Sequence, residues 1–397
     1  MSWPTAALGE ITLKIGSGST PRGGGESYKS CGIPLIRSMN VHDGMFVDGG
    51  LAYLDELQAA TLKHVTLHVG DVLLNITGAS VARVCRLPDQ LSGGRVNQHV
   101  SIIRPDKKRL DTNFLAHLLR APEAKRGLLR VAGAGATREA ITKAQIEEFK
   151  IPVPPLDEQR RIAAILDKAD ALRRKRKRAL DLLGSLTQSI FLEMFGDPEN
   201  NPKGWKRGRI SDLLEETQYG TSAKAGEKGK YPILRMGNIT SDGRTDFEDL
   251  KYIDLDDKDL DKSTLRRGDI LFNRTNSAEL VGKTAVFDRD ERFAFAGYLV
   301  RARAKKGVSP HYISGYLNSR HGKATLRGMA KSIVGMANIN AKEMQTISML
   351  LPDIQTQDAY SKGLSSIEKS RSKFQRHLGS LDSLFSSLQS RAFSGQL

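Results

Sequence analysis

The sequence predicts an α+β protein made of two tandem-repeat α/β domains separated by two long helices that pair as an antiparallel coiled coil. Three observations lead to this prediction: an internal repeat, two long apolar stripes with helical spacing, and short apolar runs between turn residues. A chain of 397 residues is long enough for two or three domains, each with its own core. We expect domains at 1–155 and 197–352, and long helical segments at 156–196 and 353–397.

The first domain alternates short apolar runs with clusters of turn residues, which predicts a small, mainly antiparallel and twisted sheet. The predicted strands are 33–38, 71–76, 81–87 and 98–104. The predicted helices are 111–120, 122–131 and 142–150. The glycine-rich stretch Gly16–Gly25 interrupts this pattern and predicts a loop.

The stretch Pro154–Phe195 predicts one uninterrupted helix. Its prolines hold the chain extended before the helix, and Asp157 and Glu158 place negative charge in the first turn, where amide groups lack partners. Apolar side chains then recur every three or four residues, as in a helix that buries one stripe against another helix. The predicted seam is Ile162, Ile165, Leu172, Leu183 and Ile190.

An internal repeat determines the architecture. Residues 66–77, TLHVGDVLLNIT, recur as TLRRGDILFNRT at 264–275, with seven of twelve positions identical and a shift of 198. Residues 33–41 return at 231–239 with the same shift. Two such shifts span almost the whole chain, so the chain is a tandem duplication of a domain followed by a long helix.

The second long helix follows from the same repeat. Gln159 corresponds to Gln357, and Phe195 corresponds to Phe393. Two helices with matching stripes can bury them on each other, and pseudo-twofold symmetry between the halves favours an antiparallel pair. The alternative, in which each helix packs only on its own domain, is disfavoured by the length of the stripe. The second predicted seam is Leu364, Ile367, Phe374, Leu378 and Leu381.

The net charge of +16 favours a polyanionic partner, and nucleic acid is the first candidate. The alternative is a basic protein without such a partner. No apolar run has the length of a bilayer crossing, so we expect a cytoplasmic protein without membrane contact. Two cysteines, without CxxC spacing or clustered histidines, support neither a disulfide framework nor a zinc site.

Two similar basic domains held apart by stiff helices suit the reading of two sites on one rigid polymer, and double-stranded DNA is such a polymer. The two domains differ strongly away from their shared framework. We therefore expect two unlike half-sites and a target that is not a palindrome.

Polar segments between the strands hold the candidate DNA contacts, because amide side chains can pair bidentately with adenine and arginine with guanine. Turn capping is the alternative role for any single Asn or Thr. Arg37 and Arg235 follow strands at matched positions, where a phosphate contact and a framework salt bridge are both open and the framework role is favoured. The candidates in the first domain are Ser19, Thr20, Arg22, Arg37, Asn40, Asn75, Thr77, Ser80, Gln98, His99 and Arg138. The candidates in the second domain are Tyr219, Ser222, Lys224, Arg235, Asn238, Asn273, Arg274, Thr275, Asn276, Ser277 and Lys283.

The run Arg173–Arg178 places cations on every face of the first long helix. Like charges repel one another unless an anion is near, so we expect partial contact with DNA, and an acidic patch on a partner protein is the second option. A solvated surface is the alternative.

Catalytic signatures are absent from the sequence. There is no N-P-P-[YF] motif of an adenine methyltransferase, and the VGKT at 281–284 has Ser277 where a phosphate-binding loop needs its first glycine. We therefore expect a non-catalytic chain that binds neither cofactor nor metal.

The tandem arrangement, the helix start PPLDEQRRIAAILDKADAL at 154–172, the turns GDVLLN and GDILFNRTN, and the final SRAFSGQL resemble the specificity subunit of a type I restriction-modification system. The resemblance covers essentially the whole chain and implies two target recognition domains that read an asymmetric bipartite DNA sequence. It also implies that the long helices fix the gap and dock two modification subunits, which methylate adenine at N6. One departure is that the second helix start, PDIQTQDAY, lacks the acidic pair of Asp157 and Glu158.

The resemblance further implies ATP-dependent restriction subunits, which act as motor and nuclease. S-adenosylmethionine, ATP and Mg then belong to the partner subunits, and none of them to this chain. Two rival functions stay open: a stand-alone DNA methyltransferase or nuclease with an unrecognised motif, and a coiled-coil adaptor that binds no DNA.

Overall fold

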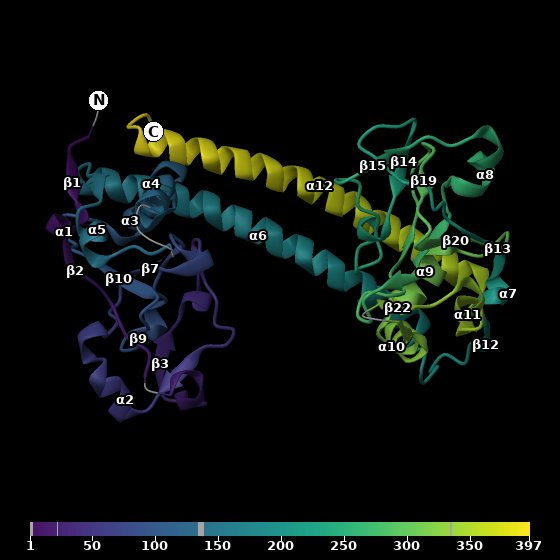
Figure 1. The fold of residues 1–397 in the computed structure, drawn as a ribbon, viewed down its shortest axis with the longest axis horizontal. Coiled ribbons are helices and arrows are strands. Elements are labelled where there is room, and N and C mark those ends of the chain that lie inside the picture. The colour runs from purple at the N-terminus through teal and green to yellow at the C-terminus, as the bar shows by residue number, and fades with distance from the viewer. Residues whose placement is uncertain (1–2, 22, 134–138, 334–335) are drawn as a thin grey trace. The chain divides into compact units, whose positions relative to one another are not determined.

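The computed structural model describes residues 3–21, 23–133, 139–333 and 336–397. The chain divides into two compact units: unit 1 is Met1–Arg176 with His377–Leu397, and unit 2 is Lys177–Arg376. Both divisions fall inside the two 40-residue helices α6 (Leu156–Phe195) and α12 (Ile354–Phe393). Each unit therefore holds one head domain and a part of both long helices (Figure 1).

Head 1, the part of unit 1 outside the long helices, is built on a four-stranded antiparallel sheet ordered β2-β10-β7-β8. Successive residues of a strand point to opposite faces of a sheet. Val72 and Leu74 of β7 accordingly join one apolar core, and Leu73 between them joins another. Because both faces are buried, the strand has a continuous apolar run. The strands are β2 (Thr12–Ser17), β7 (Val72–Asn75), β8 (Val84–Arg86) and β10 (Val100–Pro105).

Helices cover one face of this sheet, and a small sheet ordered β6-β3-β9 covers the other. The β3–β9 pair is parallel, so head 1 is mainly rather than wholly antiparallel. The helices of head 1 are α1 (Leu8–Ile11), α2 (Glu56–Thr61), α3 (Thr112–Arg120), α4 (Pro122–Gly133) and α5 (Lys143–Glu147). The other strands are β1 (Thr5–Ala7), β3 (Ile33–Ile36), β4 (Val41–His42), β5 (Met45–Phe46), β6 (Ala52–Leu54), β9 (Arg95–Val96) and β11 (Lys150–Pro152).

Head 2, the corresponding part of unit 2, repeats this design with a sheet ordered β13-β20-β16-β18 and a small sheet ordered β15-β14-β19. A further sheet, β17-β22-β21, adjoins them. The helices are α7 (Ile210–Leu213), α8 (Leu260–Ser263), α9 (Pro310–Asn318), α10 (Arg320–Met329) and α11 (Ala341–Gln345). The strands are β12 (Lys206–Arg209), β13 (Leu214–Tyr219), β14 (Tyr231–Leu234), β15 (Lys251–Ile253), β16 (Ile270–Asn273), β17 (Thr275–Asn276), β18 (Thr284–Val286), β19 (Ala294–Phe295), β20 (Leu299–Ala304), β21 (Lys331–Ile333), β22 (Met336–Asn338) and β23 (Ser348–Leu351).

Local spacing misplaced one predicted element of head 1 and missed several short ones, β2 among them. The predicted helix at 142–150 ends at Glu147, and Lys150–Pro152 form a strand that pairs with β1 near the start of the chain. The sequence analysis also missed β2, which pairs with β10. Both strands depend on partners far away in the sequence, which periodicity cannot reveal.

The two long helices pair in antiparallel fashion within each unit, which confirms the prediction. In unit 1, Arg161 donates a hydrogen bond to the Leu397 carbonyl at 2.7 Å, and Arg173, further along α6, donates to the Asp382 carboxylate at 2.6 Å, earlier in α12. In unit 2, the Phe195 ring lies 5.3 Å from the Tyr360 ring, centroid to centroid. The pairing joins the start of one helix to the end of the other.

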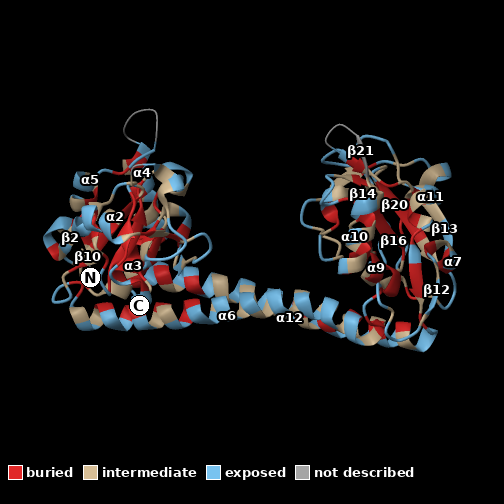
Figure 2. Cartoon of the chain, turned by 90° about the horizontal axis from the view of Figure 1, so that it is seen from below, coloured by how far each residue is buried: buried red, intermediate tan, exposed pale blue. Residues whose placement is uncertain are grey.

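The ends of the long helices also close the head cores. Phe385 and Ala392 of α12 are buried in the core of unit 1, and the Phe393 ring packs edge-on against Phe114 of α3 at 5.7 Å. Phe191 and Phe195 of α6 are buried in the core of unit 2. Figure 2 shows buried residues at the ends of α6, whereas no residue between Asp170 and Phe191 is fully buried.

A buried glutamine fastens the start of each long helix to its head. Gln159 accepts a hydrogen bond from the Asp111 amide at 2.8 Å and donates to the Pro154 carbonyl at 2.8 Å. Gln357 makes the equivalent bonds to Ser309 and Pro352, both at 3.0 Å. Asp111 and Ser309 in turn cap α3 and α9. The recurrence of this glutamine therefore has a structural cause.

The predicted seam of α6 is partly wrong. Ile162 and Ala169 are buried, but Leu172 is 48% exposed, and Leu166, which the predicted seam leaves out, is buried. Ile165, Leu183 and Ile190 are half-buried. The helix carries two neighbouring apolar stripes, and spacing alone does not tell which one the head and α12 cover. In α12, Ile367 is buried and the other predicted residues, Leu364, Phe374, Leu378 and Leu381, are half-buried, as expected.

We predict opposite effects for two Gly→Ala substitutions in helices of unit 2. A methyl group at Gly315 would lie 2.6 Å from the Tyr360 hydroxyl and 3.1 Å from Phe191, so overpacking should lower the free energy of unfolding by about 1–3 kcal/mol. Gly363→Ala meets open space, and better helix propensity should raise it by up to about 1 kcal/mol. Urea unfolding of both variants measures the difference. Equal midpoints would contradict the packing described at Gly315.

Candidate nucleic-acid interface

In head 1, three sequence-distant segments meet where the central sheet ends. We define edge 1 as Thr20, Thr77, Gln98 and His99, which form a chain of hydrogen bonds. Thr20 bonds to the Gln98 side chain, the amide nitrogen of Gln98 lies 3.2 Å from His99 Nε2, and His99 Nδ1 lies 2.6 Å from Thr77 Oγ1. The structure thus brings together four predicted candidates that lie up to 79 positions apart in the sequence.

The chain on edge 1 leaves neutral donors available. When the Gln98 amide donates to Nε2, a neutral His99 carries its proton on Nδ1 and donates it to Thr77. The Thr77 hydroxyl proton and the second amide proton of Gln98 then have no partner within the chain. Gln98 is exposed, so these groups can reach a base edge in a groove.

In head 2, the corresponding place carries different side chains. We define edge 2 as Tyr219, Arg274, Asn276, Tyr298 and Asn338. The Arg274 guanidinium lies 4.9 Å from the centre of the Tyr219 ring, and the Arg274 amide donates to the Tyr298 carbonyl at 3.0 Å. Tyr219 and Tyr298 are 42% and 53% exposed, so edge 2 presents aromatic rings and a cation to solvent.

The two edges share one backbone framework. The Ile141 amide donates to the Ile76 carbonyl at 2.8 Å, and the Ile339 amide donates to the Arg274 carbonyl at 2.9 Å. Arg274 therefore occupies the position that Ile76 has in head 1. The same framework carries an apolar side chain in one head and a cation in the other.

The sequence analysis missed Tyr298 and Asn338. Tyr298 takes the structural place of His99, because both carbonyls accept a hydrogen bond from the segment after the buried strand. The repeat shift of 198 pairs His99 with Gly297 instead, so a one-residue offset hid this equivalence in the sequence. Asn338 donates to Thr275 Oγ1 at 3.1 Å across the β17–β22 pair, a contact that no local pattern indicates.

Four of the five predicted asparagines are framework residues, which corrects their assignment as DNA contacts. Asn75 and Asn273 are fully buried, and their amide groups donate to the Ser38 carbonyl at 2.9 Å and the Met236 carbonyl at 3.4 Å. The other two, Asn40 and Asn238, are buried and accept hydrogen bonds from the backbone amides of Arg37 and Arg235. None of these amides can reach a base without unfolding the turn that it holds.

Arg37 and Arg235 also hold turns, as the favoured interpretation expected. Arg37 donates to the Gly50 carbonyl, and Arg235 pairs with the Asp249 carboxylate at 2.9 Å. Lys283 donates to the Met236 carbonyl at 3.3 Å, and burial lowers its pKa. Each of these three cations therefore has a partner within its own head.

The other residues predicted to contact DNA differ in how exposed they are. Thr275 is buried against Asn338, and its role as a direct contact is withdrawn. Arg22 and Arg138 lie outside the described residues. The candidates that reach the surface are Ser19, Ser80, Ser222, Lys224 and Ser277.

The run Arg173–Arg178 is divided between framework and surface. The buried Asp170 accepts hydrogen bonds from Arg173 at 3.1 Å and Arg174 at 2.8 Å, and lies 3.6 Å from Arg120. The Asp170–Arg120 pair ties α6 to head 1, and Arg173 also donates to Asp382 of α12, so the expectation of DNA contact does not extend to Arg173. The exposed members of the run are Arg174, Lys175, Lys177 and Arg178.

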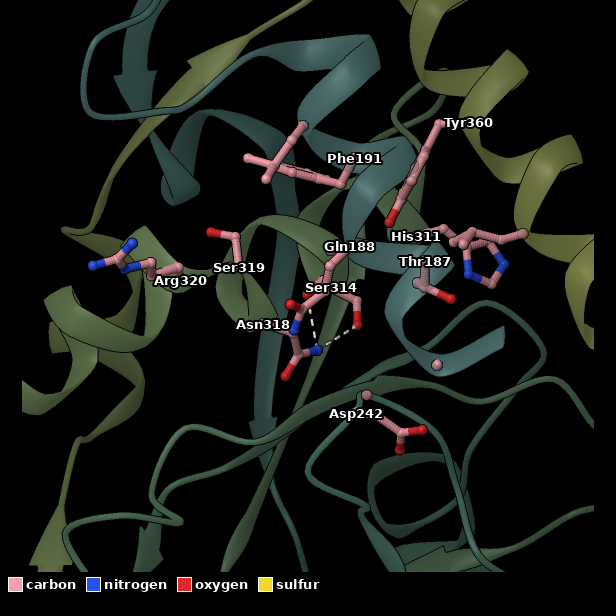
Figure 3. Close-up of a pocket in the computed structure, with 15 residues that line it drawn as sticks. Thr187, Gln188, Phe191, Asp242, His311, Ser314, Asn318, Ser319, Arg320 and Tyr360 are labelled. Carbon is pink, nitrogen blue, oxygen red and sulfur yellow. Dashed lines mark hydrogen bonds between the residues drawn. The ribbon is translucent and has the colours of Figure 1, made fainter. Parts of the chain in front are cut away.

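A cavity of about 100 Å³ lies within unit 2 between α6, α9 and α12 (Figure 3). Phe191 and Tyr360 form an aromatic wall, and Asn318 donates to Ser314 on the opposite side. Asn318 Oδ1 is buried without a partner among the described residues, and the volume suits a few water molecules that could satisfy it. The cavity contains no edge 2 residue and no catalytic grouping, so we assign it to packing.

In the part of the chain that the structure describes, no three His, Cys, Asp or Glu side chains gather as metal ligands would. None of the described helices combines the length and the apolar content that a bilayer crossing needs.

Comparison with known proteins gives consistent matches along the chain. The family model described as type I restriction modification DNA specificity domain matches twice, at residues 2–181 and 202–378. The specificity subunit of type I restriction enzyme EcoKI from Escherichia coli strain K12 is 24% identical over 421 residues, covering 100% of this chain and 89% of that protein. The StySPI specificity subunit from Salmonella potsdam is 22% identical over 420 residues, with the same coverage.

Two solved structures share the fold. The S subunit of a type I restriction-modification system from M. genitalium aligns with a TM-score of 0.59 at 14% identity, covering 99% of this chain and 96% of that one. A chain from a structure concerned with complex assembly and conformational transition of the type I R-M system aligns with a TM-score of 0.58 at 18% identity, covering 100% and 98%. At these identities the likeness establishes the fold.

We predict that the buried asparagines affect stability rather than sequence preference. Asn75→Ala removes the side-chain donor to the Ser38 and Val41 carbonyls, and Asn273→Ala removes one of the two side-chain donors to the Met236 carbonyl. Each loss of a buried hydrogen bond should lower the free energy of unfolding by about 1–3 kcal/mol. Asn276→Ala, on edge 2, should leave stability within about 0.5 kcal/mol. Chemical denaturation measures all three variants. A loss of stability in Asn276→Ala equal to that in Asn273→Ala would contradict the division between framework and edge.

Proposed function

The chain belongs to the type I restriction modification DNA specificity family, and we propose that it reads an asymmetric bipartite DNA target for a type I restriction-modification complex. The supporting observation is that two heads with one framework present different side chains on edges 1 and 2. Unlike edges select unlike half-sites, and together they give a long, non-palindromic sequence. The expected subunit role, recognition rather than catalysis, is confirmed by family membership.

The rival functions have less support. A stand-alone methyltransferase or nuclease would need a catalytic grouping, and neither the sequence nor the edges offer one. An adaptor that binds only protein has no use for a net charge of +16 and two polar edges. S-adenosylmethionine, ATP and Mg would then bind to the modification and restriction subunits, where the chemistry takes place.

We infer that the middle of α6 docks a modification subunit. Leu182 and Leu186 are 61% and 41% exposed and lie four residues apart on one helix face. Half-buried Ala179, Leu183 and Ile190 flank them on that face. An exposed stripe of leucines is costly in water and typical of a surface that a partner covers.

The binding test of this function uses the full chain together with the modification subunit of its host. DNA affinity should fall steeply as salt rises, and excess specific DNA should compete far better than random duplex. Affinity independent of salt would favour the adaptor.

We predict that charges on the leucine stripe disrupt the complex. Leu182→Lys and Leu186→Lys should weaken binding of the modification subunit by tenfold or more, since each buried leucine contributes about 1.5–3 kcal/mol. The matched control is Leu57→Lys, an exposed leucine of α2 in head 1 that lies outside both long helices. Analytical ultracentrifugation measures assembly. Unchanged assembly in both stripe variants would show that the partner docks elsewhere.

We predict that the paired helices set the gap between half-sites. Inserting four residues near Ala179 in α6, with four at the matching place in α12, adds about 6 Å to each helix. The preferred gap should lengthen by one or two base pairs while both half-site sequences stay the same. Selection of bound duplexes from a random library measures the gap. An unchanged gap would show that the paired helices do not set the distance between the half-sites.

A further inference from the structure

Arg274 leaves the backbone of head 2 from a fixed point. It lies between β16 and β17, its amide donates to the Tyr298 carbonyl at 3.0 Å, and its carbonyl accepts from the Ile339 amide at 2.9 Å. Its position is therefore held from two sides, and the direction of its side chain depends on local contacts alone.

The Tyr219 ring is the main contact of the Arg274 side chain. The guanidinium carbon lies 4.9 Å from the ring centre, within the range of a cation–π interaction. Tyr219 is itself fixed at both ends, because its backbone is paired in β13 and its hydroxyl accepts from the Ala341 amide at the start of α11, at 3.0 Å. The ring is thus a rigid support for the guanidinium.

The charge of Arg274 is not balanced within the head. Among the described residues no carboxylate pairs with it, whereas Arg235, Arg301 and Arg303 of the same head all have carboxylate partners. Among the described residues, its side chain makes a single polar contact, a long one of 3.5 Å from Nη1 to the Gly297 carbonyl. The planar fork therefore keeps donors for an external acceptor pair.

We propose that Arg274 contacts a guanine in the half-site read by head 2, through O6 and N7, and that Tyr219 is the positioning residue for this contact. This inference rests on the proposed function, and it adds the identity of one base in the target and of the two residues that recognise it. A guanine edge matches a fixed, planar fork. The residues that share edge 2 with Arg274 include the neutral Asn276, Tyr298 and Asn338, whose amide and hydroxyl groups can also pair with base edges.

The guanine contact belongs to one half-site only. Head 1 has Ile76 in the equivalent position, and an isoleucine side chain has no donor for a base edge. The same place in the two repeats therefore contributes to the asymmetry of the target.

The experiment selects bound duplexes from a random library with the full chain and its modification subunit. Wild type should select a guanine in one half-site. Arg274→Ala should lose that guanine and keep all other selected positions, with affinity for the wild-type target lower by roughly tenfold or more. Tyr219→Leu should weaken the same preference although Arg274 is present. Tyr219→Phe keeps the ring and should retain the preference, which a merely structural role of the hydroxyl would not predict.

Replacing the selected base then tests whether Arg274 contacts N7 of the guanine. Replacing the selected guanine by 7-deazaguanine removes N7 and should weaken binding by wild type, whereas Arg274→Ala should be indifferent to the change. A uniform loss of affinity for all sequences in Arg274→Ala, with a shallower salt dependence, would assign Arg274 to phosphate and overturn the inference. Selection of no sequence by wild type would instead overturn the proposed function itself.

Discussion

The burial of each long-helix end in a head core is the contact on which the rest of the structure depends. Phe385 and Phe393 of α12 complete unit 1, and Phe191 and Phe195 of α6 complete unit 2. In the sequence, α6 follows head 1 and α12 follows head 2. The core of each head is therefore completed by aromatic side chains of the long helix that follows the other head. With about 1.5–3 kcal/mol for each buried phenylalanine, removal of either helix end would exhaust much of the stability of a small domain. Each head therefore depends for its stability on the end of a long helix that follows the other head.

On this scaffold the repeats agree at the buried amide side chains that hold the turns and the helix starts, and they differ at the exposed ends of the sheets. The buried glutamines and asparagines recur in both halves, and their amides are bound to carbonyls of the same unit. At the sheet ends, the neutral hydrogen-bond chain of edge 1 contrasts with the stacked cation of edge 2. The two repeats thus keep one framework and differ in the exposed side chains of edges 1 and 2. Under the proposed function, this difference gives one fold two specificities.

The architecture could be predicted from the sequence because it depends on self-similarity and helical spacing, both of which are local or repeated signals. The seam of α6 could not be fixed in the same way, since Leu172 and Leu166 fit neighbouring stripes equally well and only the tertiary partner selects Leu166. Recurrence showed that Asn75 and Asn273 share a task but did not distinguish base contact from turn support. The pairing of Arg274 with Tyr219, 55 positions apart in the sequence, required the coordinates.

The central claim is that one chain supplies a two-part, asymmetric DNA address to a methylating complex. Sequencing of adenine methylation in a host that carries the gene, and in the same host after its deletion, tests this most directly. The account predicts methylated adenines in two unlike sequence blocks separated by a constant number of unspecified bases, and their loss on deletion. Methylation in a palindromic or single contiguous motif, or a pattern unchanged by the deletion, would contradict it.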